Sequence, residues 1–130
     1  MNQNRIGYQN PKLYNDIEKV LFQLLKMHKR INKIYRITIL EKEVYPRLIN
    51  AMQNTLHIGI NKKRLTFEEI CDLTDKIVND FYIVKTFLSF LVLHNYLDKK
   101  FYFIISNEFE QINMQLHGWK KYLKGIKNEN

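Results

Sequence analysis

Two stretches of this chain carry large apolar residues at heptad spacing, alternately three and four residues apart. The first stretch has seven such residues: Leu13, Ile17, Val20, Leu24, Met27, Ile31 and Ile34. The second has six: Phe109, Ile112, Leu116, Trp119, Leu123 and Ile126. Such a seam follows one face of an α-helix and must be covered by another apolar surface. The pattern predicts a long N-terminal helix over 11–36 and a long C-terminal helix over 107–126.

Glycine and proline are scarce in the chain, with 4 and 2 residues among 130. Loops must therefore be few and elements long, which favours helices over a sheet of many strands. The length predicts a single domain over 1–130, because a chain of about 150 residues already buries roughly two thirds of its unfolded surface.

The net charge of +8 is distributed unevenly along the chain. Lysine and arginine exceed the acids by 6 in residues 1–36, by 3 in 37–65 and by 3 in 99–130, whereas residues 66–98 carry a net charge of −4. A basic balance favours nucleic acid or another polyanion as partner. The lysines beside the first seam form either a solvated helix face or a face that contacts phosphates.

Helix signals continue between the two seams. The β-branched stretch 34–40 still fits the helical period, and Pro46 breaks or restarts the helix. A further helix is predicted over 45–57. Thr66 followed by Glu69 is a capping box, in which each side chain bonds the other residue's backbone N–H. This capping box predicts the start of a short helix.

A break, a longer helix and a strand are expected next. The short helix is predicted to end near Thr74, and Asn79 or Asp80 to cap the next helix, which continues to about His94. After the polar residues 98–100, the aromatic and β-branched run 101–105 predicts a strand.

The order of elements from Tyr45 onward resembles that of bacterial winged-helix repressors, and local residues support the resemblance. Their second helix often reads Leu-Thr-x-x-Glu-Leu-Ala, and the matching residues here are Leu65, Thr66, Glu69, Ile70 and Cys71. Their third helix has Val, Leu, Leu, a terminal Gly and two apolar residues, matched here by Val84, Leu88, Leu91, Asn95, Tyr96 and Leu97. Asparagine tolerates the left-handed conformation of that Gly, so Asn95 is expected to reverse the chain.

The resemblance implies a mainly α fold with a small β-wing, in which a winged-helix core over 45–106 is flanked by the long terminal helices. It also implies binding to duplex DNA, as a small dimeric transcriptional regulator or as a DNA-binding protein of a mobile element or virus. The groove-facing residues would be Tyr82, Lys85, Thr86 and Ser89. Lys99 and Lys100 at the wing tip, and Lys62, Lys63 and Arg64 on the other side, would contact the flanking phosphates.

The acidic charge of the helix-turn-helix segment favours an alternative function. Phosphate neutralisation supplies much of the affinity of DNA-binding proteins, and the proposed reading helix carries a single basic residue, Lys85. The alternative is a winged-helix protein–protein interaction module, an adaptor or inhibitor that does not read DNA.

Helices that flank a winged-helix core often pair across a two-fold axis. We therefore expect a homodimer whose interface comprises Leu13, Ile17, Val20, Leu24, Ile112, Leu116, Trp119 and Leu123. The alternative is that the two terminal helices pack on each other within one chain.

The sequence contains no recognisable catalytic apparatus, so we expect a protein that is not an enzyme and has no cofactor. Its histidines lack metal-ligand spacing and no cysteine pair accompanies them: His28, His57, His94 and His117. No glycine-rich phosphate loop is present. Cys71 is the single cysteine, residues 1–9 are polar, and no apolar run approaches the roughly 20 residues of a membrane span, so we expect a cytoplasmic protein.

Overall fold

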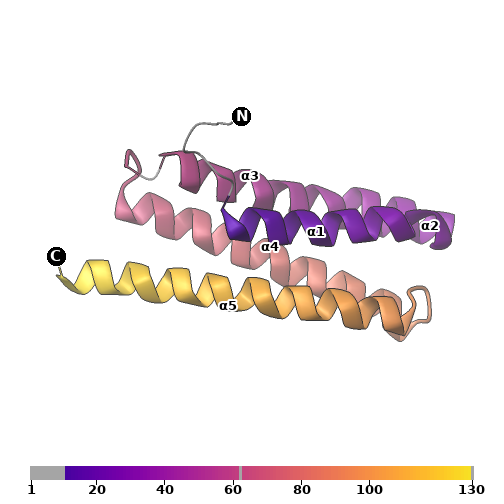
Figure 1. Ribbon diagram of the computed structural model, residues 1–130. Coiled ribbons are helices and arrows are strands. Elements are labelled where there is room, and N and C mark those ends of the chain that lie inside the picture. The colour runs from indigo at the N-terminus through magenta and orange to yellow at the C-terminus, as the bar shows by residue number, and fades with distance from the viewer. Residues whose placement is uncertain (1–10, 62, 130) are drawn as a thin grey trace, which may run out of the picture.

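Four long helical segments run alternately up and down beside one another in the computed structural model (Figure 1). The structure describes residues 11–61 and 63–129, without the side chains of 123, 124 and 126–129. The first segment is α1 (Lys12–Met27), and the 3₁₀ turn η1 (His28–Arg30) follows it. The others are the continuous run of α2 (Lys33–Tyr35), η2 (Arg36–Val44) and α3 (Tyr45–Asn61), then α4 (Phe67–Leu93), then α5 (Lys99–Glu129).

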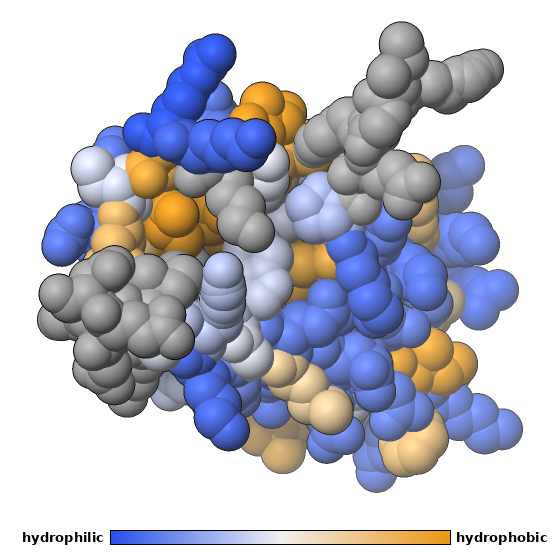
Figure 2. Space-filling view, turned by 60° about the vertical axis from the view of Figure 1, so that its left-hand side comes forward, coloured by the Kyte–Doolittle hydropathy of each residue, from blue (hydrophilic) through white to orange (hydrophobic). Residues whose placement is uncertain are grey.

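The four segments form a closed ring of neighbours, in which α1 contacts α3 and α5, and α4 contacts α3 and α5. Helix α1 has 16 residues and α5 has 31, or about 24 and about 46 Å. All four segments therefore lie together only near the end where α1 meets α2 (Figure 1). Figure 2 is turned so that the other end of the bundle, where α3 turns into α4, comes forward, and the surface in this view mixes hydrophilic and hydrophobic side chains.

Most described residues of the two heptad seams are buried in the core of a single chain. Six of the eight residues predicted to form a dimer interface are at most 2% exposed: Leu13, Ile17, Val20, Leu24, Ile112 and Leu116. Trp119 is half-buried against the same core, and the side chain of Leu123 lies outside the described part. The seams thus pack within one chain, which was the alternative to pairing between two copies.

The predicted β-wing is wrong, because residues 101–105 form the beginning of α5 and the described residues contain no strand. The side chain of Asp98 accepts a hydrogen bond from the backbone N–H of Lys100 at 3.0 Å, which starts the helix. Ile105 is fully buried and continues the spacing of Phe109 and Ile112 by one helical step. Packing of this face against the core overrides the β-propensity of the aromatic and β-branched residues.

The predicted break between residues 74 and 80 is also wrong, because α4 is continuous from Phe67 to Leu93. This stretch contains neither glycine nor proline, and Ile77 in its middle is fully buried. The Thr74 hydroxyl donates to the Ile70 carbonyl, and Asp80 accepts a hydrogen bond from Arg47 of α3. With one helix in place of two, and no ribbon behind it, the winged-helix core over 45–106 is overturned, although the mainly α class is confirmed.

The helix predicted over 11–36 ends at Met27 instead of continuing to residue 36. Ile31 takes an extended conformation, and the side chain of Asn32 accepts the Ile34 N–H at 3.0 Å to start the next helical run. This turn redirects the chain, so the last residue of the seam, Ile34, leaves the core and is 65% exposed.

The segment before Pro46 is a π-helix, in which the Tyr45 N–H donates to the carbonyl of Leu40, five residues back. Proline lacks an N–H and its ring clashes with the carbonyl four residues before it in a regular α-helix. A wider turn before Pro46 relieves this clash, so the predicted break becomes a local change of helix type.

Buried polar bonds tie the helices together. Asp16 of α1 accepts hydrogen bonds from Lys12 at 2.8 Å and from Gln115 of α5 at 2.6 Å. Burial raises the pKa of Asp16, but these bonds and the charges of Lys12 and Lys19 outweigh burial and lower it overall. For Asp80, burial outweighs the nearby Arg47, so its pKa is raised.

Candidate nucleic-acid interface

Two chain turns meet at the end of the bundle where all four helical segments are present (Figure 1). The first turn, residues 28–32, joins α1 to α2, and the second, residues 94–98, joins α4 to α5. Ile31 of the first turn and Leu97 of the second are each 4% exposed and belong to the core. The remaining polar and aromatic side chains of the two turns are therefore held on a packed base.

The second turn has the hydrogen bonds of a Schellman motif. The Tyr96 N–H donates to the Leu91 carbonyl at 2.8 Å, and the Asn95 N–H donates to the Val92 carbonyl at 3.0 Å. Asn95 has a φ of 62°, so the left-handed conformation predicted for it is confirmed. The capping box of Thr66 and Glu69 is confirmed as well.

An aromatic ladder of four side chains, Tyr35, Tyr96, His94 and Phe90, crosses this end of the molecule. Tyr35 and Tyr96 stack with ring centroids 3.9 Å apart, and the Tyr35 hydroxyl donates to the Tyr96 hydroxyl at 2.9 Å. This hydrogen bond raises the pKa of Tyr35. His94 lies between Tyr96 and Phe90, with centroid distances of 6.4 and 4.6 Å. The ladder links α2 to the α4–α5 turn.

Basic side chains gather around the two turns. The segments 26–36 and 94–103 carry seven lysines and arginines and one acid, so they contribute +6 of the net +8 of the chain. We call these seven residues the basic end: Lys26, Lys29, Arg30, Lys33, Arg36, Lys99 and Lys100. All are exposed except Arg36, which is half-buried. The ion pairs found between described residues use none of them.

A pocket of about 500 Å³ opens between the two turns. It is lined by Met27 at the end of α1, by Arg30 and Ile31 of the first turn, and by residues 95–99, which comprise most of the second turn and the first residue of α5. The guanidinium of Arg30 lies 3.7 Å from the Met27 sulfur, which places its charge beside the pocket wall. Asp98 is the one acid among these lining residues, and its carboxylate already caps α5.

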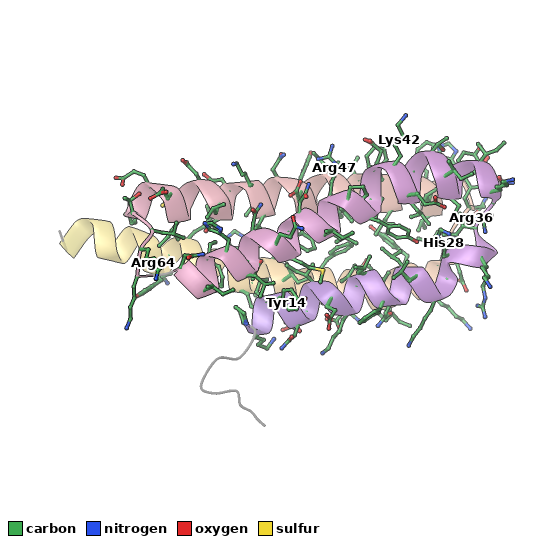
Figure 3. All side chains as sticks on the ribbon, turned by 90° about the horizontal axis from the view of Figure 1, so that it is seen from above. Tyr14, His28, Arg36, Lys42, Arg47 and Arg64 are labelled. Carbon is green, nitrogen blue, oxygen red and sulfur yellow. The ribbon has the colours of Figure 1, made fainter. Side chains whose placement is uncertain are left out.

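A hydrogen-bonded histidine fastens the first turn to the bundle. His28 lies between α1 and the η2–α3 run (Figure 3), where its Nδ1 is 2.9 Å from the Tyr45 hydroxyl and its Nε2 is 3.4 Å from the Glu41 carboxylate. Burial, together with the negative charge of Glu41, raises the pKa of Tyr45 to about 12.

The raised pKa of Tyr45 predicts a loss of stability in alkali. An unfolded tyrosine ionises near pH 10, so the stabilisation by the neutral phenol is complete below that pH and is lost as the pH rises towards 12. We expect the free energy of unfolding of the wild type to fall by on the order of 2 kcal/mol more than that of Tyr45→Phe across this window. Urea titrations at several pH values measure this difference, and parallel curves for the two proteins would contradict the assignment.

The predicted DNA-contacting residues do not form one surface. Lys99 and Lys100 belong to the basic end, at the start of α5 instead of a wing tip. Lys63 and Arg64 lie at the α3–α4 turn, a full α4 length of about 40 Å away, and Figure 3 shows Arg64 far from Arg36 and His28. Lys62 lies outside the described residues.

The four residues predicted to face a DNA groove lie in the second half of α4. Tyr82 and Lys85 are exposed there, and the Thr86 hydroxyl donates to the Tyr82 carbonyl at 2.9 Å. Ser89 is half-buried and bonded to the Tyr102 hydroxyl of α5 at 2.7 Å, so it belongs to the α4–α5 contact. These residues form part of a bundle helix that no wing accompanies.

The lysines beside the first seam are candidates for phosphate contact from the sequence alone. Their position at the same end of the bundle as Lys99 and Lys100 could not be predicted from it. A usable signal was present, because residues 26–36 contain five cations and no acid and include Tyr35.

The described residues contain neither a group of three metal-ligating side chains nor a helix long and apolar enough to cross a membrane. Comparisons with known protein families, curated proteins and solved structures find no match for this chain.

Proposed function

We propose that this chain binds nucleic acid through the basic end, by contacts between lysine and arginine side chains and the phosphate backbone. The observation that supports this proposal is the gathering of seven cations from two distant segments of the chain around two adjacent turns. Neutralisation of phosphates with release of counterions supplies most of the affinity of such proteins.

The free state of these cations strengthens the proposal. Elsewhere in the described part, four cations are engaged by carboxylates of the same chain, namely Lys12, Lys19, Arg47 and Lys120. The other described cations outside the basic end are in no such ion pair, so it is the clustering of free cations that distinguishes the basic end. The cations of the basic end have no such engagement in the described ion pairs, so a polyanion could bind them without first breaking internal salt bridges.

The acidic charge of α4 makes the distribution of charge along the bundle asymmetric. Helix α4 carries five acids and two lysines, and its first turn contains Glu68 and Glu69. This helix begins at the end of the bundle remote from the basic end (Figure 1). A nucleic acid would be attracted more strongly to the basic end, because the acids at the start of α4 offset the charges of Lys63 and Arg64 in the preceding turn.

A salt titration of the unmodified protein tests the proposal. We expect fluorescence anisotropy with labelled oligonucleotides, both duplex and single-stranded, to detect binding at low micromolar protein in about 50 mM salt. The logarithm of the binding constant should fall with the logarithm of salt concentration with a slope of about −4 to −6, if most of the seven cations each neutralise one phosphate. Absence of binding under these conditions would remove the proposal.

A protein-binding role is the second candidate, favoured by exposed apolar side chains beside the basic end. Leu93 is 76% exposed and Ile34 is 65% exposed. Exposed apolar groups rimmed by polar residues are typical of protein interaction sites. This candidate differs in its expectation for the titration, because it predicts no affinity for oligonucleotides of either kind.

A further inference from the structure

We propose that the pocket between the two turns accepts one unpaired nucleotide, which makes single-stranded nucleic acid the preferred ligand of the basic end. This inference rests on the proposed function and names the class of nucleic acid for that site. A single strand and a duplex differ in what they can place inside a pocket.

The size and walls of the pocket suit a nucleotide. A volume of about 500 Å³ lies within the range of roughly 300 to 1,000 Å³ that is typical of small-molecule sites. The half-buried Met27 provides the accessible apolar wall against which a base can lie, and the buried Ile31 and Leu97 form the floor beneath it. Ile31 and Leu97 are buried in the core, so this part of the pocket is formed before any ligand arrives.

The polar groups of the pocket match the remaining parts of a nucleotide. Arg30 and Lys99 enter from opposite turns, so a phosphate between them would be contacted from two sides. The exposed side-chain amide of Asn95 offers a donor and an acceptor, which is what the edge of an unpaired base requires. Tyr96 is held in place by its stacking on Tyr35, so the mouth of the pocket keeps its shape.

A duplex cannot use these groups in the same way. Its bases are paired and stacked inside the helix, and a base enters a protein pocket only after unstacking and unpairing. A duplex would therefore contact the basic end through phosphates alone, whereas a single strand would add the contacts of one base. Burial of the base against apolar side chains and a hydrogen bond to the Asn95 amide are each expected to contribute severalfold in affinity, or about one order of magnitude together.

Two variants with the same change of charge distinguish the contribution of the pocket to binding from that of the surface around it. Arg30→Gln with Lys99→Gln removes the two lining cations, and Lys33→Gln with Lys100→Gln removes two exposed cations of the same end that do not line the pocket. Each variant is titrated with an unstructured single strand and with a duplex of equal length, at one salt concentration. Thermal unfolding by circular dichroism verifies that both variants are folded.

We expect the wild type to bind the single strand about tenfold more tightly than the duplex. The variant Arg30→Gln with Lys99→Gln should reduce this preference severalfold. The variant Lys33→Gln with Lys100→Gln should weaken the binding of both ligands by equal factors. In addition, Met27→Phe, which fills the pocket without changing charge, should remove the preference and leave duplex affinity unchanged.

Equal affinity of the wild type for the two ligands would overturn the inference while leaving the proposed function standing. The same conclusion would follow if the two double variants reduced the affinities for the single strand and for the duplex by the same factors. Absence of binding to either ligand would overturn the proposed function and the inference together.

Discussion

Reversal of three charges where α1 joins α2, Lys29→Glu, Arg30→Glu and Lys33→Glu, is expected to weaken oligonucleotide binding by at least about 100-fold at low salt. The three side chains are exposed and lie within one turn of chain. Their reversal removes three phosphate contacts and adds repulsion, so the salt slope should shrink by about 3.

A matched control separates this local effect from the effect of net charge. Lys63→Glu, Arg64→Glu and Lys121→Glu also reverse three exposed cations, and both triple variants lower the net charge from +8 to +2. Lys63 and Arg64 lie at the α3–α4 turn, and Lys121 lies in the second half of α5. We expect this variant to retain most of the affinity, with a loss of at most severalfold from the weaker long-range field.

Anisotropy titrations of both triple variants at several salt concentrations provide the measurement. Circular dichroism spectra should match the wild type, because all six positions are exposed. Equal losses of affinity in the two variants would mean that net charge alone drives binding and that the basic end has no special role.

The substitution Ile104→Pro is expected to destabilise the protein by about 3 kcal/mol or more, whereas Lys99→Pro should have little effect on stability. Ile104 lies in the second turn of α5, where its N–H belongs to the helix and a proline ring would clash with the carbonyl of Lys100. Lys99 is the first residue of α5, where the N–H has no partner within the helix.

Ile104→Ala controls for the loss of the side chain. Ile104 is 49% exposed, so its truncation should cost much less than the proline. Urea unfolding followed by circular dichroism gives the free energies of unfolding of the wild type and of Ile104→Pro, Lys99→Pro and Ile104→Ala. If residues 101–105 formed an edge strand, proline could be accommodated there at small cost. Nearly equal stabilities for Ile104→Pro and Ile104→Ala would therefore contradict the helical start of α5.

Features governed by neighbouring residues could be predicted from the sequence. The capping box needs only Thr66 and Glu69, and the left-handed Asn95 needs only a helix that ends beside a tolerant residue. The burial of most seam residues could be predicted in the same way, because heptad spacing places residues such as Ile17 and Ile112 on one face of their helix, whatever surface covers that face.

The tertiary structure decided the state of residues 101–105 and the partner of each seam. Aromatic and β-branched residues favour a strand locally by at most about 1 kcal/mol, and burial of Ile105 and Phe109 against the other helices outweighs this preference. A seam likewise requires an apolar cover without specifying its source. The cover came from the same chain because four helical segments connected by short turns place α1 and α5 side by side.

The candidate site depended on tertiary structure in the same way. The positive charge of residues 26–36 is evident from the sequence, but Lys99 and Lys100 are more than 60 positions away from them. The alternating direction of the helices brings the two turns to one end and leaves Lys63 and Arg64 at the other. Charge is a property of individual residues and can be read along the chain, whereas a binding surface depends on distances that only the packed helices determine.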